Sequence, residues 1–245
     1  NRISPSSHTR GHEESVGLTR EILAWLESWG RWVLNGSHAL ELEVSKLRQE
    51  LAFRRYGIRS PRTYLANSKE SLLELADRFE GPFITKHNQG GKGLGVRRFD
   101  SLEDFDDYVD GPDYEHPVDG ITLLQEYLHP VGGYITRVEI VGGQFLYALT
   151  ADTRAGFQLC PADECDDTSA GLGLCPADAQ TAGSLFHWRE GFRDPIIDRY
   201  LEFSRFWGIG IAGFEFIETE DRRETEQRFA RDRICSHEAE HENQT

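Results

Sequence analysis

The chain has 245 residues, of which 27 are Lys or Arg and 42 are Asp or Glu, so its formal net charge is −15. Because nonspecific binding to DNA or RNA depends on many cationic contacts with phosphates, this acidic balance argues against a nucleic-acid partner. No apolar run approaches the roughly 20 residues that a bilayer span needs, and the polar N-terminus lacks the apolar segment of a signal peptide. We therefore expect no membrane contact and a cytoplasmic location.

The composition is that of a folded protein with reduced thiols. Hydrophobic residues make up 38% of the chain and aromatic residues 11%, which is enough for one large core or two smaller ones. The four cysteines are too few for a disulfide scaffold. The sequence contains no Met and begins with Asn1, so we expect it to be a fragment of a longer protein.

The N-terminal third is predicted to be largely helical. Apolar residues at helical spacing predict a first amphipathic helix ending at Gly30, with Trp25, Trp29 and Trp32 as core or subdomain contacts. A short strand over 32–34 and a turn over 35–36 follow. Ser37 is then expected to cap a second helix that continues with one apolar face as far as Gly57.

Strands and helices alternate in the remainder. Ser68 and Ser101 are expected to cap helices, and the acidic residues 103–107 to form a solvated helix face. The predicted strands cover 83–86, 96–99, 121–124, 136–141, 144–151 and 209–217, and a helix covers 195–207. Residues 152–192 look irregular. The polar tail after Glu218 is expected to be a frayed helix or disordered, and no strand is predicted there.

The glycine-rich segment between the strands at 83–86 and 96–99 is a candidate phosphate loop. Glycine lets backbone N–H groups approach an anion closely. A P-loop or a Rossmann loop runs into a helix, whereas this segment joins two strands, and the tripeptides His-Arg-Asp and Asp-Phe-Gly of protein kinases are absent. Of the four lysines, Lys86 lies on the strand that leads into the loop and Lys92 lies within it. We expect phosphate binding here, although a solvated surface hairpin is the alternative.

Several motifs in order resemble the ATP-grasp superfamily, and specifically its RimK-like alpha-L-glutamate ligase group. The resemblance covers roughly residues 20–218. The motifs that carry it are Val44-Ser45-Lys46, Phe83-Ile84-Thr85-Lys86, the loop from Gln89 to Val96, Gln125-Glu126-Tyr127-Leu128, Ile135-Thr136-Arg137-Val138 and Gly213-Phe214-Glu215-Phe216.

The resemblance implies an α+β ATP-grasp fold, in which two α+β subdomains clamp ATP. Residues 1–44 would be a remnant of the N-terminal pre-ATP-grasp domain. Residues 45–128 would form the central subdomain with the glycine-rich hairpin, and 129–218 the C-terminal subdomain. Residues 219–245 would be a polar tail, disordered or aberrant.

The resemblance also assigns site residues. Lys46 and Lys86 would contact the nucleotide phosphates, and Glu215 would be the first magnesium ligand. Arg137 and Arg154 would hold the transferred phosphoryl group. The loop that closes over ATP would contain Gln89, Gly90, Gly91, Lys92, Gly93 and Gly95, and the adenine-binding hinge would contain Gln125, Glu126, Tyr127 and Leu128.

The implied activity is that of an ATP-dependent carboxylate–amine ligase. A carboxylate would attack the γ-phosphate of ATP, and an amine would displace phosphate from the resulting acyl phosphate. Cations must neutralise the crowded negative charge, so Mg²⁺, or Mn²⁺ in its place, is expected with ATP. The implied partners are an amino acid such as glutamate and an amine or carboxylate acceptor, and no oligomeric state is implied.

Two departures from the family pattern bear on activity. Ile135-Thr136-Arg137 replaces the Asp-Ile-Arg of the members closest to the ribosomal-protein modifying enzyme. In addition, the acidic residue and the Asn that should follow Glu215 on a second strand are not evident. One carboxylate with phosphates is a poor magnesium site, so we expect weak or absent turnover.

Two alternatives remain open. A non-catalytic ATP-binding or partner-binding domain would explain the missing magnesium strand. A zinc site from Cys160, Cys165, Cys175, Cys235, His237 and His241 is the less favoured idea, because these residues lack the paired spacing of structural zinc sites.

Overall fold

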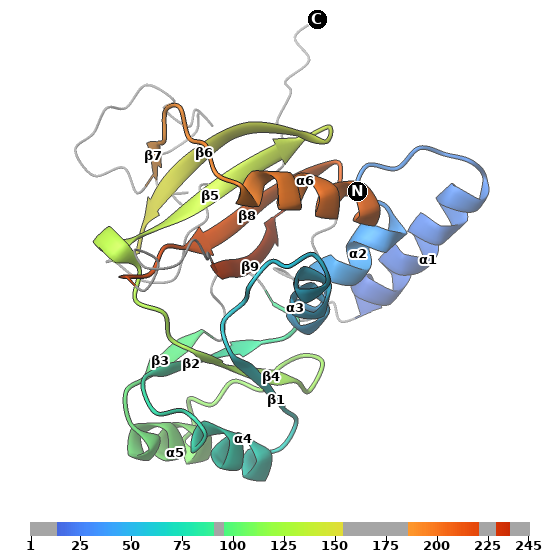
Figure 1. Ribbon diagram of the computed structural model, residues 1–245. Helices are drawn as coiled ribbons and strands as arrows, with labels where there is room; N and C mark the ends of the chain where they lie inside the picture. Colours follow the sequence, from blue (N-terminus) through green and yellow to red (C-terminus); the bar gives the residue numbers. More distant parts are fainter. Residues whose placement is uncertain (1–13, 91–95, 154–185, 221–228, 236–245) are drawn as a thin grey trace, which may run out of the picture.

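The computed structural model describes residues 14–90, 96–153, 186–220 and 229–235. Within these ranges the fold is α+β and contains two antiparallel sheets. Figure 1 shows the larger sheet above the smaller one, with α3 between them at the side of the molecule. No helix in the described part of the chain is both long and apolar enough to cross a lipid bilayer.

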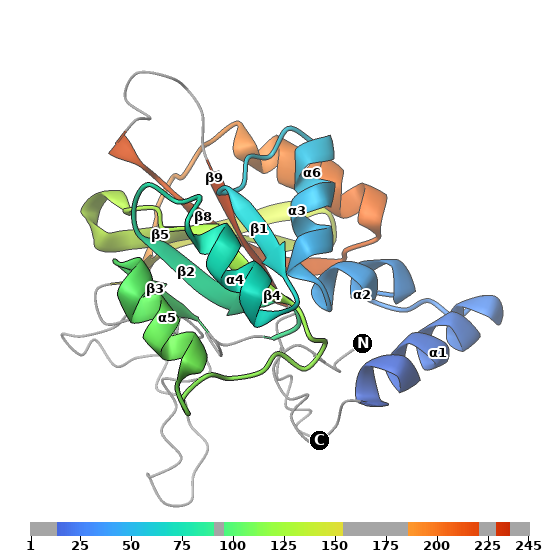
Figure 2. The same ribbon diagram turned by 90° about the horizontal axis from the view of Figure 1, so that it is seen from below.

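The smaller sheet has four strands in the order β1-β4-β2-β3. Its strands are β1 Thr63–Ala66, β2 Phe83–His87, β3 Arg97–Phe99 and β4 Thr122–Glu126. Helices α4 (Lys69–Ala76) and α5 (Leu102–Asp110) cover one face, as Figure 2 shows from below. A buried aromatic core, which includes Phe83 and Phe105, joins the helices to that face. Neither of these helices covers the opposite face of the smaller sheet.

The larger sheet has five strands in the order β7-β6-β5-β8-β9. They are β5 Tyr134–Val141, β6 Gln144–Asp152, β7 Phe186–Trp188, β8 Ile211–Ile217 and β9 Phe229–Cys235. Helices α2 (Ser37–Glu43), α3 (Lys46–Arg55) and α6 (Ile196–Trp207) bury one face of it. Phe53 of α3 and Phe203 of α6 pack with ring centroids 4.9 Å apart in this core.

Most of the predicted elements are confirmed. Ser68 and Ser101 cap α4 and α5, and both predicted hairpins are antiparallel strand pairs. The glycines 142 and 143 that join β5 to β6 both have positive φ, which is why glycine suits this turn. The exposed acidic side of α5 is confirmed as well. Strand β1, the short helix η1 (Val131–Gly133) and strand β7, which lies in the stretch 152–192 expected to be irregular, were not predicted.

The predicted strand over 32–34 is wrong, because these residues are irregular. The predicted turn is present, with Asn35 at φ 52°. The side chain of Asn35 accepts a hydrogen bond from the Gly210 amide at 2.8 Å and donates one to the Ile211 carbonyl at 2.8 Å. The Asn35 side chain therefore makes the hydrogen bonds to the start of β8 that the backbone of a neighbouring strand would otherwise make.

The single helix predicted from Ser37 to Gly57 is two helices. The chain breaks at Val44 and Ser45, and Ser45 starts α3 by accepting a hydrogen bond from the Arg48 amide. Ser37 does not cap α2, because its hydroxyl bonds the Glu27 carboxylate at 2.5 Å instead. The break puts Lys46 at the first position of α3.

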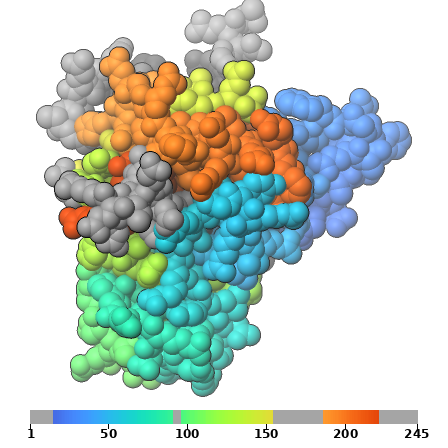
Figure 3. All heavy atoms as spheres, viewed as in Figure 1, coloured from blue at the N-terminus to red at the C-terminus, as the bar shows by residue number. Residues whose placement is uncertain are grey.

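The predicted burial of the tryptophans is wrong. Trp25, Trp29 and Trp32 are 61%, 69% and 86% exposed. Helix α1 (Glu14–Ser28) instead buries its opposite side through Leu23, which packs on α2. Figure 3 shows the α1 segment, in blue, projecting from the side of the molecule.

The polar tail contains a strand, contrary to expectation. Strand β9 pairs antiparallel with β8, and its Arg231 is in register with Glu215. The free edge of β8 provides backbone hydrogen-bond partners, so a polar segment can form a strand there without an apolar pattern of its own. The remaining tail residues lie outside the described ranges.

Candidate functional site

Lys86 lies on the face of the smaller sheet that α4 and α5 leave uncovered. Side chains alternate along a strand, so Phe83 and Lys86 point to opposite faces, and Phe83 is in the core under the two helices. Lys86 is only 5% exposed. Figure 1 shows the larger sheet on this side of β2. The strand pattern therefore directs this cation toward the region between the sheets.

Lys46 connects the start of α3 with the beginning of the glycine-rich segment. Its ammonium group donates hydrogen bonds to the carbonyls of His87 at 2.8 Å and Gly90 at 2.6 Å. Its backbone amide bonds the Asn88 carbonyl at 3.2 Å. Lys46 and Lys86, which lie 40 positions apart in the sequence numbering, are thereby brought to the same end of β2.

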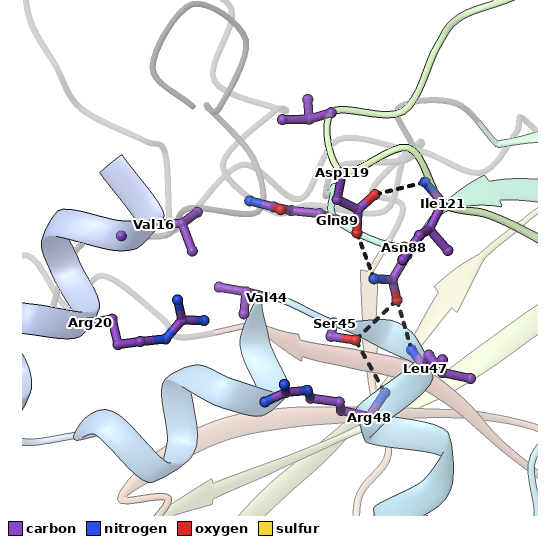
Figure 4. Close-up of a pocket in the computed structure, with 12 residues that line it drawn as sticks. Val16, Arg20, Val44, Ser45, Leu47, Arg48, Asn88, Gln89, Asp119 and Ile121 are labelled. Atoms are coloured by element: carbon purple, nitrogen blue, oxygen red, sulfur yellow. Dashed lines mark hydrogen bonds between the residues drawn. The ribbon is translucent and has the colours of Figure 1, made fainter. Parts of the chain in front are cut away.

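Asn88 holds this corner together. Its side-chain oxygen accepts hydrogen bonds from the Ser45 hydroxyl at 3.1 Å and from the Leu47 amide at 3.0 Å. Its side-chain nitrogen donates to the Asp119 carboxylate at 2.7 Å (Figure 4). Because Asn88 is 5% exposed and bonds three segments, it sets the position of α3 relative to β2 and β4.

Only the first part of the predicted phosphate loop falls within the described residues. Gln89 and Gly90 are partly buried and follow Asn88 directly. Gly91, Lys92, Gly93 and Gly95 lie outside the described ranges, and so does Arg154. Their roles stay predictions.

The predicted hinge begins with the last two residues of β4. The Gln125 amide group donates to the Thr63 hydroxyl at 2.8 Å, and the Glu126 carboxylate accepts from the Arg62 amide at 2.7 Å. The Glu126 and Tyr127 amides bond the carbonyls of Arg62 and Pro82 at 3.0 and 2.9 Å. The side chains of Gln125 and Glu126 and two backbone N–H groups of the hinge are therefore engaged inside the protein.

Leu128 ends the hinge beneath the larger sheet. It packs against a small buried cluster of Ile135, Ala151 and Ile217, whose side chains come from β5, β6 and β8. The hinge thus crosses from one sheet to the other at this residue.

The larger sheet carries a buried charge cluster on the face away from α6. The Arg137 guanidinium bonds the Glu139 carboxylate at 2.5 Å and the Glu215 carboxylate at 3.2 Å. All three side chains are at most 3% exposed. Arg137 and Glu215 are cross-strand neighbours of β5 and β8, and Arg137 and Glu139 share a face because they are two residues apart. The cluster, Arg137–Glu139–Glu215, combines one cation with two carboxylates.

Two neighbours shape this cluster. A Cβ atom at Gly213 would collide with the Arg137 guanidinium, so glycine makes the space in which that group lies. Tyr147 is paired with Glu139 across β5 and β6. Burial raises the pKa of the Tyr147 phenol, and the nearby Glu139 carboxylate raises it further.

The residues around Glu215 could hold a magnesium ion only together with a nucleotide, because Glu215 is the one carboxylate assigned to the ion. Mg²⁺ commonly takes one or two carboxylates together with substrate phosphates and water. Glu215 has a second carboxylate oxygen besides the one that contacts Arg137. Among the residues that the structure describes, no group of three or more His, Cys, Asp and Glu side chains could hold a metal ion without such help.

Sequence reasoning missed Glu139 and Asn88. The signal for Glu139 was its position two residues after Arg137 on a predicted strand, which puts both side chains on one face. Asn88 had no comparable signal, because its partners Ser45 and Asp119 are remote in the chain.

His87 and the candidate zinc ligands are not part of the site described above. The His87 ring bonds the Glu115 carbonyl at 3.0 Å and is 5% exposed, so this histidine is packed inside the smaller sheet's end of the molecule. The cysteine and histidine side chains suggested for zinc all lie outside the residues whose side chains are described.

No protein-family model matches the chain. Among curated proteins, a probable alpha-L-glutamate ligase of Pseudoalteromonas atlantica is 27% identical over 136 residues. The match covers 55% of this chain and 44% of that relative, so the chain spans less than half the length of the relative.

Solved structures share the architecture. The ATP-grasp ligase PsnB, complexed with a minimal precursor, Mg and ADP, superposes with a TM-score of 0.57 over 90% of this chain and 58% of PsnB, at 17% identity. The D-alanine–D-alanine ligase of Bacillus anthracis, complexed with ATP, gives 0.59 over 87% of this chain and 62% of that enzyme, at 14% identity. This chain has the ATP-grasp fold. The predicted ATP-grasp fold and the resemblance to the RimK-like glutamate ligase group are confirmed.

Proposed function

We propose that this ATP-grasp chain carries the nucleotide site of an ATP-dependent carboxylate–amine ligase. The observation that carries the proposal is the convergence of Lys46, Lys86 and the start of the glycine-rich segment at one end of β2. Two cations beside glycine backbone suit the triphosphate of ATP. The glutamate ligase relative and the two ATP-grasp ligase structures support the same reading.

The proposed reaction has two steps. A carboxylate oxygen attacks the γ-phosphorus of ATP, which releases ADP and leaves an acyl phosphate. An amine nitrogen then attacks the carbonyl carbon, the bond to the phosphate oxygen breaks, and the products are an amide, inorganic phosphate and a proton. Lys46, Lys86 and Arg137 would neutralise the phosphoryl oxygens, and Arg154 would join them.

Glu215 would hold Mg²⁺ together with the ATP phosphates. Bound there, the ion supplies charge neutralisation at the transferring phosphoryl group. Arg137 already contacts Glu215, so it would lie next to the same phosphoryl oxygens. Glu139 keeps the guanidinium in this position from its other side.

Adenine would lie against the hinge, between the proposed subdomains 45–128 and 129–218. The Glu126 and Tyr127 amides bond other parts of the chain, so we propose the Leu128 N–H as the hinge donor to the base. Among the backbone N–H groups of the four-residue hinge, we thus assign adenine binding to that of Leu128 alone.

The amine or the carboxylate would come from an amino acid. Glutamate is the first candidate, because the relative is named for it, and the acceptor would be a peptide, a protein or a small amine. The PsnB structure contains a precursor, which favours a peptide acceptor.

Calorimetric titration of ATP, with and without Mg²⁺, tests the site. We expect micromolar binding that Mg²⁺ strengthens, and loss of binding in Lys86→Ala. Lys69→Ala is the matched control, because Lys69 is 46% exposed and pairs with Asp110 on the far side of the smaller sheet. Full affinity in Lys86→Ala, with folding verified by circular dichroism, would refute the assignment.

A second candidate function is a non-catalytic ATP-binding or partner-binding domain. The register of β9 favours it, because the residue paired with Glu215 is Arg231 and not an acidic one. ATP binding without ADP release, across a panel of amino acids and peptides, would support this second function over the ligase.

A further inference from the structure

A second site lies beside the proposed phosphate corner. A pocket of about 530 Å³ opens between α1, the start of α3 and the segments that follow β2 and precede β4. This volume is within the range of about 300–1,000 Å³ typical of small-ligand pockets. Figure 4 shows Arg20 and Asp119 on opposite sides of it. The side chains of Arg20 and Arg48 have no part in the proposed nucleotide site, and Asp119 takes part only as the hydrogen-bond partner of Asn88.

One side of the pocket is cationic. Arg20 and Arg48 both line it, and both form ion pairs with the same carboxylate, that of Glu41. Two guanidinium groups share one carboxylate, so this side keeps one excess positive charge. Each guanidinium has five N–H donors, and Glu41 occupies only part of them. The arrangement suits a second carboxylate, bound by the remaining donors.

The other side is anionic and held in place. One oxygen of the Asp119 carboxylate accepts a hydrogen bond from Asn88 at 2.7 Å, and the other accepts from the Ile121 amide at 3.2 Å. Each carboxylate oxygen can accept two hydrogen bonds, so both oxygens retain capacity for a ligand. A fixed carboxylate suits an ammonium group, because little side-chain freedom is lost on binding.

The walls between the two charged sides are largely apolar. Val16 of α1, Val44 before α3, and Val118 and Ile121 before β4 line them. Asn88 joins Asp119 directly to the segment that follows Lys86. Asn88 therefore links the anionic side of the pocket to the proposed phosphate site.

We propose that this pocket binds a dipolar ligand of dipeptide size, with its ammonium group at Asp119 and its carboxylate at Arg20 and Arg48. The volume of about 530 Å³ and the placement of the charged side chains on opposite sides favour a ligand whose ammonium and carboxylate groups are several bonds apart (Figure 4). In the ligase, on which this identification of the ligand as a substrate rests, the amine would lie at Asp119, which Asn88 links to the phosphate corner.

Calorimetry without nucleotide tests the pocket, with L-glutamyl-L-glutamate as the probe. We expect binding that weakens about tenfold or more in the double variant Arg20→Gln/Arg48→Gln, as for loss of hydrogen bonds to a charged group. N-acetylation of the dipeptide, which removes the ammonium charge, should weaken binding by a similar factor. Arg78→Gln is the matched control, because Arg78 is also an exposed arginine in an ion pair, with Glu74.

Separate outcomes distinguish the pocket from the nucleotide site. Lys86→Ala should lose ATP and still bind the dipeptide, which would support the pocket even if ligase turnover is absent. No dipeptide binding by the folded chain, or equal binding by the double variant and by Arg78→Gln, would overturn the proposal. Equal affinity for the free and acetylated dipeptides would overturn the role of Asp119.

Discussion

Arg137 heads the fully buried side chains in the described part of the chain by volume, and its charge explains its surroundings. A buried guanidinium is costly unless it is paired, and here Glu139 and Glu215 flank it. The cluster still carries one excess negative charge among these three groups. A bound cation would therefore meet favourable electrostatics, which agrees with the proposed role of Glu215.

Replacing Arg137 with Met should lower the free energy of unfolding by about 3–5 kcal/mol, as for other buried pairs that lose one partner. The reason is that Glu139 and Glu215 would face each other without the guanidinium. Urea unfolding at pH 7 measures the change. Glu139→Gln is the control, because Arg137 keeps Glu215 in that variant, and it should cost clearly less. Equal losses in the two variants would contradict this account.

Tyr147 makes stability depend on pH in the alkaline range. Its pKa is raised in the folded protein by burial and by Glu139, so folding favours the neutral phenol. The stabilisation that comes from this raised pKa is fully present below the ordinary tyrosine pKa of about 10. It is lost as the pH rises through the pKa of Tyr147 in the folded protein. Unfolding measured from pH 8 to 11 should therefore show a smaller alkaline loss in Tyr147→Phe. An unchanged pH profile in that variant would contradict the prediction.

At the scale of elements, the start of α3 is the feature on which the site depends. Ser45 caps the helix and also bonds Asn88, so the same hydroxyl serves local structure and the phosphate corner. A helix running through this region without a break would turn Lys46 away from Gly90. The break between α2 and α3 is therefore part of the candidate site.

Ser45→Ala and Ser68→Ala should separate these two roles. Each removes an N-cap and should cost about 0.5–2 kcal/mol of stability by urea unfolding. Only Ser45→Ala should also weaken ATP binding in calorimetry, because Ser68 caps the remote helix α4. Equal ATP affinity in both variants would show that the Ser45 cap does not contribute to the nucleotide site, contrary to this prediction.

Two of the errors of sequence reasoning share a cause. The wrong strand over 32–34 and the undivided helix both involve residues that bond partners far away in sequence. Asn35 bonds residues about 175 positions away, and Ser45 bonds Asn88. Local propensity was sufficient for the helices capped by Ser68 and Ser101, because their caps are local.

At the scale of the whole molecule, the composition of the proposed metal site would limit the proposed reaction. Glu215 is the carboxylate assigned to Mg²⁺, and β9 pairs it with Arg231. We therefore expect ATP binding with slow or undetectable ADP release. A coupled ADP assay with glutamate and dipeptide acceptors measures this. ADP release at the rate usual for ATP-grasp ligases would contradict the expectation.

The sequence by itself determined the class of fold and the strands that bear Lys86, Arg137 and Glu215. Alternation and local caps depend on neighbouring residues, and motif order remains visible without coordinates. Only the tertiary structure decided that Glu215 contacts Arg137, that Asn88 joins three segments, and that Arg20, Arg48 and Asp119 surround one pocket. Hydrogen bonds and ion pairs between distant segments depend on how the two sheets and α1 pack, which residue spacing alone does not specify.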